Sequence, residues 1–230
     1  MLSEKFIAKY DDNFWNECAP ILTNQNKSNL KFIISKYAKK KQFANFFIAK
    51  SSTYFNDLVS EIAFAHCANY YKNQLDKKIC IIEDSIQRIN LISGKKLETK
   101  QLTIKEIKDA LKLSKRIRTF LTYINASNCK FHPKLRGYGY LNTCHPDLIT
   151  NKLIIEIKSS NYGFRLEDFR QIFLYYFLSL QNNIIINKLA LVNPRFGNAL
   201  FFNAVNFFEL MSQASSTTAL KKISKILVSN

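Results

Sequence analysis

The chain has 230 residues, of which 34 are lysine or arginine and 17 are aspartate or glutamate, so its formal net charge is +17. Hydrophobic residues make up 47%, which excludes a largely disordered chain, and no apolar run approaches the roughly 20 residues that span a bilayer. Five scattered cysteines form no CxxC pair, so neither a disulfide framework nor a zinc ribbon is expected. With no signal-peptide core at the N-terminus, we expect a cytoplasmic protein that attracts polyanions, nucleic acid first and acidic membrane surfaces second.

Residues 1–125 are predicted to be mainly helical. Apolar residues at helical spacing predict helices over 28–37, 54–65, 83–92 and 103–124. Residues 27–50 hold seven lysines and no acid, and five aromatic residues lie between these lysines. We expect the aromatic residues to pack in the core, whereas the lysines either face a phosphate backbone or are simply solvated. The basic cluster at 112–118 has the same two interpretations.

After residue 125 the pattern changes to short strands separated by turns. Strands are predicted at 139–141, 147–149, 153–158, 188–192 and 198–202, and helices at 166–180, from 205 onward and at 218–227. Strands and helices that alternate in one stretch predict an α/β architecture. We therefore divide the chain into a helical N-terminal region, 1–125, and a core, 126–230. The first would contribute a core helix near 52–72 and serve DNA binding or dimerisation.

The stretch that carries chemistry is 145–160, His-Pro-Asp-Leu-Ile-Thr-Asn-Lys-Leu-Ile-Ile-Glu-Ile-Lys-Ser-Ser. A polar turn at 150–152 predicts a hairpin, and in its second strand Glu156 and Lys158 share one face. Asp147 lies within a residue or so of being opposite Glu156. Two carboxylates bind a hard cation such as Mg²⁺, and an ammonium beside them can orient water and stabilise negative charge, which together favour metal-assisted phosphodiester hydrolysis.

The Glu-x-Lys spacing alone is weak evidence in a chain so rich in lysine, where it occurs three times. Only the copy at 156–158 lies in a predicted strand, follows a Pro-Asp pair and precedes an apolar helix. An ordinary surface hairpin is the alternative explanation for this copy.

The same stretch resembles the PD-(D/E)xK nuclease superfamily. The matching elements are Pro146-Asp147, Glu156-Ile157-Lys158 and a following helix with Gln171 and Tyr175, whose spacing is similar to the Gln-xxx-Tyr element of the RecB- and Cas4-like branch. The resemblance covers about 136–195. It implies a restriction-endonuclease-like core, with a central mixed β-sheet flanked by helices, and a helical N-terminal elaboration.

The resemblance also implies roles for the residues of the motif. Asp147 and Glu156 would bind Mg²⁺, for which Mn²⁺ can substitute, and the Ile157 carbonyl would be another ligand. Lys158 would assist catalysis. The function implied is that of a metal-dependent deoxyribonuclease in phage defence, restriction or mobile-element processing, acting as a homodimer or with partner proteins. The alternative is a nucleic-acid-binding protein of the same fold without catalysis, and a membrane-surface protein is a third reading.

Accessory residues follow from the same resemblance. Gln171 and Tyr175 would support the active centre, and Glu61, in the predicted helix at 54–65, is the candidate for another metal-binding acid. Gln171 and Tyr175 can also be plain core residues, and Glu61 an ordinary surface residue. The candidate nucleic-acid contacts come from position and charge rather than from the resemblance: Arg165 and Arg170 near the start of the predicted helix at 166–180, Arg136 in a turn, and Lys39, Lys40 and Lys41 in the basic stretch. Each can also be a solvated cation.

Overall fold

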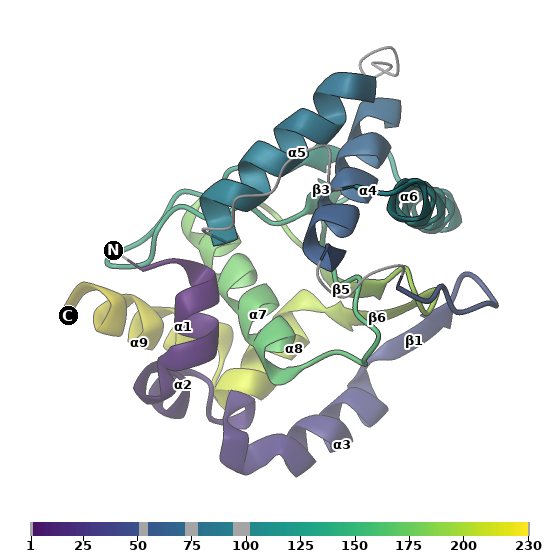
Figure 1. Cartoon of the computed structure of the whole chain (residues 1–230). Helices are drawn as coiled ribbons and strands as arrows, with labels where there is room; N and C mark the ends of the chain where they lie inside the picture. The colour runs from purple at the N-terminus through teal and green to yellow at the C-terminus, as the bar shows by residue number, and fades with distance from the viewer. Residues whose placement is uncertain (1, 51–54, 72–77, 94–101, 230) are drawn as a thin grey trace.

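The computed structural model describes residues 2–50, 55–71, 78–93 and 102–229 (Figure 1). In chain order the helices and strands are α1 (Glu4–Tyr10), α2 (Asp12–Cys18), α3 (Lys27–Tyr37), β1 (Lys39–Gln42), α4 (Asn56–Tyr71), α5 (Lys78–Ser93), α6 (Ile104–Tyr123), β2 (Lys130–Phe131), β3 (Leu148–Thr150), β4 (Leu153–Ile157), α7 (Leu166–Gln181), β5 (Lys188–Asn193), β6 (Asn198–Asn203), α8 (Ala204–Ser212) and α9 (Ser216–Ser229). Two short 3₁₀ turns, Pro20–Leu22 and Asn24–Asn26, join α2 to α3.

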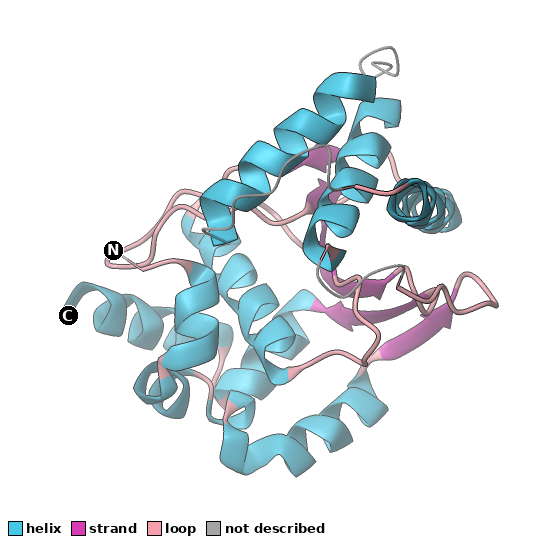
Figure 2. Ribbon diagram, in the orientation of Figure 1, coloured by secondary structure: helices cyan, strands magenta, loops and turns pink. Residues whose placement is uncertain are grey.

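The strands form one six-stranded sheet in the order β1-β6-β5-β4-β3-β2, with helices on both sides (Figure 2). Only β4 and β5 are parallel among these neighbours, and α7 makes the crossover between them. The sheet is therefore mixed, and the α/β architecture predicted from the sequence is confirmed.

A two-residue turn sets the register of the β3–β4 hairpin. Asn151 and Lys152 both have positive φ, 47° and 60°, which is the backbone that a tight hairpin of matching twist requires. Leu148 then pairs with Ile155, and the same register continued by one residue sets Asp147 opposite Glu156. The predicted hairpin is confirmed.

Each face of the sheet carries its own apolar cluster. On one face Ile154 and Leu189 pack with α7, which is buried along most of its length and is covered in turn by α1 and α8. On the other face Ile155 and Val192 pack with Ile117 and neighbouring residues of α6. Because side chains alternate along β4, residues 154, 156 and 158 face α7, and residues 153, 155 and 157 face α6.

The N-terminal region is built into this architecture rather than standing apart from it. Strand β1 pairs with β6 at one edge of the sheet, α1 packs against α7, and α4 and α6 lie together over the opposite face. The strand β1 was not expected in a mainly helical region. The predicted helix near 52–72 corresponds to α4, with residues 52–54 and 72 outside the described part of the chain.

Two expectations from the sequence are wrong. Residues 139–141 are not a strand: Gly139 and Tyr140 form a turn, and Leu141 alone makes isolated bridges, to Leu2 and Tyr138. Gly139 adopts φ +57° at this turn, where its Cα approaches the Leu227 carbonyl too closely for any side chain. The aromatic residues of 27–50 do not all pack in the core, since Phe32 is 63% exposed and Phe46 is 79% exposed.

No helix in the described ranges is long and apolar enough to cross a membrane.

Candidate active site

Asp147, Glu156 and Lys158 lie together at the open end of the β3–β4 hairpin, as their spacing predicts. The Lys158 ammonium lies 2.9 Å from Glu156 Oε1 and 3.6 Å from Asp168 Oδ1. Asp147 Oδ2 accepts a hydrogen bond of 2.7 Å from the main-chain N–H of Ile157, which fixes its carboxylate against the second strand. The three charged groups thus meet through a hairpin register and a side-chain period of two.

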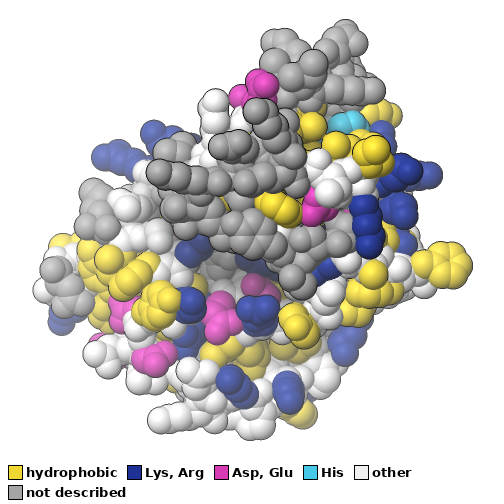
Figure 3. Space-filling model, viewed as in Figure 1, with side chains coloured by type: hydrophobic (Ala, Val, Ile, Leu, Met, Phe, Trp, Pro, Cys, Tyr) yellow, Lys and Arg dark blue, Asp and Glu magenta, His cyan; other side chains and the backbone are white. Residues whose placement is uncertain are grey.

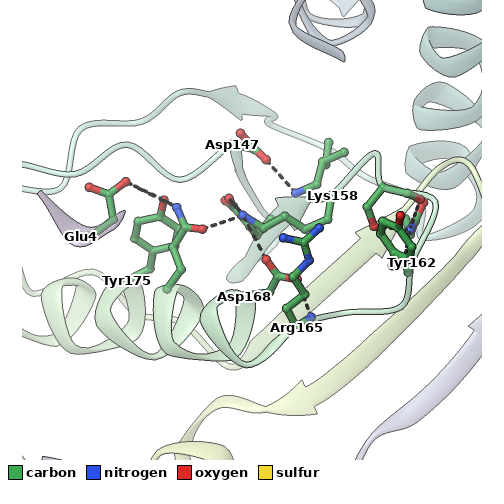
Figure 4. A network of polar contacts seen from close by, with 12 residues as sticks. Glu4, Asp147, Lys158, Tyr162, Arg165, Asp168 and Tyr175 are labelled. Carbon is green, nitrogen blue, oxygen red and sulfur yellow. Dashed lines mark hydrogen bonds and ion pairs between the residues drawn. The ribbon is translucent and has the colours of Figure 1, made fainter. Parts of the chain in front are cut away.

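Helix α7 adds Gln171 and Tyr175 to the same site, and Figure 4 shows Tyr175 on this helix. Lys158 donates to the Gln171 amide oxygen at 2.6 Å, and Gln171 Nε2 lies 2.7 Å from the Tyr175 hydroxyl. The two residues are four apart, so they occupy one face of the helix and can bond directly. They belong to the site by contact, while their part in catalysis stays a prediction.

Glu4 is a further acid at the site, and the sequence analysis did not find it. Its side chain is buried, and Oε1 lies 3.4 Å from both Gln171 Nε2 and the Tyr175 hydroxyl. Ser3 caps the first turn of α1, and this helix packs on α7, which brings Glu4 to the end of a polar chain running back to Lys158. Nothing in the local sequence around Glu4 marks such a contact, since it depends on the packing of two helices far apart in the chain.

Burial and charge set the protonation of this site. Burial raises the pKa of Asp147 well above its ordinary range, and the neighbouring Glu156 carboxylate raises it further. Burial lowers the pKa of Lys158, but Glu156 and Asp168 outweigh it and the net change is upward, so the ammonium keeps its proton. Burial also raises the pKa of Tyr175, which stays a neutral hydroxyl.

Glu61 approaches the site from α4 but already has a partner. Its Oε1 lies 3.2 Å from Arg88 Nη1, an ion pair between α4 and α5. Burial raises the pKa of Glu61 and Arg88 opposes the increase, while the Glu61 charge contributes to the raised pKa of Asp147. A role for Glu61 in metal binding stays a prediction.

The carboxylates fit a hydrated divalent cation. Glu156 Oε2 is buried and accepts no hydrogen bond from any described residue, and a cation beside Asp147 and Glu156 would offset the repulsion that raises the pKa of Asp147. In the ranges that the structure describes, no group of three or more His, Cys, Asp or Glu residues is arranged to hold a metal. Mg²⁺ does not need three such residues, because it keeps several waters and binds through one or two carboxylates plus phosphate. The Ile157 carbonyl stays a predicted ligand.

The candidate nucleic-acid contacts differ in their exposure to solvent and in their distance from the acids. Lys39, Lys40 and Lys41 are exposed on edge strand β1, and Arg165 is exposed just before α7, with its guanidinium 5.7 Å from the Tyr162 ring (Figure 4). Arg136 is also exposed, but its main chain is bonded to Asn182, just past the end of α7. That end lies about 16 Å along the helix from Gln171, so Arg136 is not beside the acids.

The prediction that Arg170 contacts nucleic acid is wrong, because its side chain is only 2% exposed. Its guanidinium donates to the carbonyls of Leu22 and Ala8 at 2.6 and 2.9 Å and to Asp12 Oδ1 at 3.3 Å, and it lies 5.1 Å from the Trp15 ring. Arg170 therefore ties α7 to the N-terminal segment that carries Glu4.

Comparison with known proteins gives no further information about this site. No family model, curated protein or solved structure matches the chain. A function for the protein has to account for the contacts themselves: two opposed carboxylates, one of them with a buried oxygen that no described residue pairs with, and an ammonium held between an acid and an amide.

Proposed function

We propose that the protein is a Mg²⁺-dependent deoxyribonuclease whose active site contains Asp147, Glu156 and Lys158. The observation that carries the proposal is a buried Glu156 oxygen that has no hydrogen-bond partner in the described part of the chain, on a carboxylate opposite Asp147 and 2.9 Å from the Lys158 ammonium. This small acidic site lies in a protein of net charge +17, which attracts the phosphate backbone that such a site would cleave.

The arrangement of elements around the site supports the proposal. The acids lie on a hairpin of a mixed sheet flanked by helices, and the helix that follows it carries Gln171 and Tyr175. This is the arrangement that a resemblance to PD-(D/E)xK nucleases and a restriction-endonuclease-like core lead us to expect. We assign α4, the helix predicted near 52–72, to that core, and α6 and the N-terminal helices to its helical elaboration.

The chain's own residues have distinct tasks in this mechanism. Asp147 and Glu156 would hold the cation, and the chemistry that Mg²⁺ supplies in such a site is neutralisation of phosphate charge and activation of water. Lys158 keeps its proton and can donate a hydrogen bond to the attacking water or to a phosphate oxygen as negative charge develops. Asp168 and Gln171 fix the direction in which the ammonium points.

The test is a cleavage assay with supercoiled plasmid and with a labelled single strand, in Mg²⁺, in Mn²⁺ and in EDTA. We expect cleavage with either metal, none in EDTA, and loss of activity of about a thousandfold or more in Asp147→Asn and Glu156→Gln. Glu83→Gln, an exposed carboxylate on α5, is the matched control and should keep full activity. If the folded protein bound DNA but never cleaved it, this result would contradict the proposed nuclease activity. It would favour a catalytically inactive nucleic-acid-binding protein.

A further inference from the structure

Helix α6 presents a row of cations to solvent. Lys105, Lys108, Lys112 and Lys115 are all exposed, and their spacing of three and four residues puts them on one side of the helix. From the first to the last the row extends about 15 Å. Figure 3 shows Lys and Arg side chains gathered over α6 at the right of the view.

The two acids of α6 do not offset this row, because both are buried and paired. Glu106 accepts from the main-chain N–H of Thr103 at 2.7 Å and completes a capping box at the start of the helix. Asp109 forms two hydrogen bonds, of 3.1 and 3.0 Å, with the guanidinium of Arg195. The outer surface of α6 is therefore strongly cationic although the helix contains acidic residues.

The lysine row forms one wall of a groove of about 580 Å³. Lys105, Lys108 and Lys112 lie on this wall, and Phe47 and Lys50 lie on the other, in the segment that follows β1. A groove with four ammonium groups along its walls fits an extended polyanion better than a compact apolar ligand.

Two phenylalanine rings lie exposed beside the groove. Phe46 is 79% exposed and Phe47 is 49% exposed. The loop that carries them is held in place, because Arg116 of α6 donates to the Phe46 carbonyl and the Phe47 ring lies 5.0 Å from that of Phe196. Exposed aromatic rings next to a basic track are the combination on which unpaired bases stack.

A buried arginine connects the groove with the candidate active site. Arg195 pairs with Asp109 under the lysine row and donates to the Ala49 carbonyl at 3.2 Å in the opposite wall. Its Nε also donates to the carbonyl of Ser159, the residue directly after Lys158, at 3.2 Å. Both walls of the groove and the end of the catalytic strand are thus fixed to one side chain.

We propose that this groove binds a single strand of nucleic acid, with its phosphates along the α6 lysines and its bases on Phe46 and Phe47. The inference names the strand that the site at Lys158 acts on, and in this respect it rests on the proposed function. A duplex keeps its bases stacked inside and can use the lysines but not the rings, so the strand rather than the duplex is the preferred ligand.

The test is fluorescence anisotropy of a labelled oligothymidylate in EDTA, which reads binding without cleavage. Lys108→Glu/Lys112→Glu should weaken binding at least tenfold and flatten its salt dependence. The matched control is Lys221→Glu/Lys222→Glu on α9, which changes the net charge equally on exposed residues elsewhere, and its effect should stay below threefold. Phe46→Ala should weaken binding to the strand about fivefold and leave a duplex of equal length unaffected. Circular dichroism checks that each variant is folded.

If both double-lysine variants lost the same affinity for the strand, net charge alone would explain the binding. That result would overturn the groove as the binding site. An equal loss of strand and duplex in Phe46→Ala would overturn the assignment to single strands. These binding results are independent of the test for nuclease activity. If the protein binds through the groove but never cleaves DNA, the inference about the groove still holds. If it cleaves DNA and Lys108→Glu/Lys112→Glu binds the strand as well as the unchanged protein does, only the inference about the groove is overturned.

Discussion

Lys158 and Gln171 are joined by a hydrogen bond of 2.6 Å between the ammonium and the amide oxygen, and this bond connects the end of β4 to α7. Through the same amide, Lys158 is linked to Tyr175 and then to Glu4 at the start of the chain. The orientation of the Lys158 ammonium therefore depends on residues of α7 and α1 as well as on Glu156.

Gln171→Met should lower kcat for DNA cleavage about 10- to 100-fold with little change in KM. Methionine fills a similar volume but removes a hydrogen bond to a charged group, which contributes about 1.5–3 kcal/mol. Steady-state kinetics in Mg²⁺ separate the two constants. Gln171→Glu keeps an oxygen acceptor for Lys158 and should recover part of kcat, which a purely structural role would not predict.

Glu4→Gln should lower kcat about three- to tenfold, less than Gln171→Met does, because its contacts of 3.4 Å are long for hydrogen bonds to oxygen. Affinity for DNA in EDTA should not change. Glu17→Gln, an exposed carboxylate on α2, is the matched control. An unchanged kcat in Glu4→Gln would remove Glu4 from the set of residues that position the site.

Glu156→Gln should weaken Mn²⁺ binding at least about tenfold in isothermal titration calorimetry, because it removes one of the two carboxylates proposed to hold the cation. Glu61→Gln is measured in parallel, since Glu61 is already paired with Arg88. If Glu61→Gln lost as much affinity for Mn²⁺ as Glu156→Gln, Glu61 would be a further metal ligand. Unchanged Mn²⁺ affinity in Glu156→Gln would contradict the proposed metal site.

Arg170→Met should lower the free energy of unfolding by about 2–4 kcal/mol, because it leaves two buried carbonyls without donors. Arg165→Met makes the same change on an exposed residue next to the same helix and should cost less than about 0.5 kcal/mol. Urea denaturation followed by circular dichroism measures both. Equal stability of the two variants would contradict the role of Arg170 in holding α7 to the N-terminal segment.

The sequence predicts the local parts of the site well. The hairpin that sets Asp147 opposite Glu156 follows from strand alternation and a polar turn, and the contact of Gln171 with Tyr175 follows from helical spacing. Both patterns depend on residues close together in the chain. The restriction-endonuclease-like core and its activity remain predictions.

Contacts between distant segments were beyond the sequence analysis. Glu4 reaches the site only because α1 packs on α7, and β1 is a strand only because β6 offers it an edge. Arg170 was expected to face a phosphate because it lies near the start of the predicted helix at 166–180, and its burial depends on carbonyls of the first 22 residues. Such pairings are decided by tertiary packing and leave little trace in spacing or composition.

The two edges of the sheet have a consequence for self-association. At one edge the exposed lysines of β1 alternate between the two faces, so a second copy that paired there would set ammonium groups opposite one another. At the other edge β2 offers only two residues to a partner strand. Neither edge favours extension of the sheet from molecule to molecule, so a dimer of this protein would form through helices and loops, and its sheet would end with its own strands.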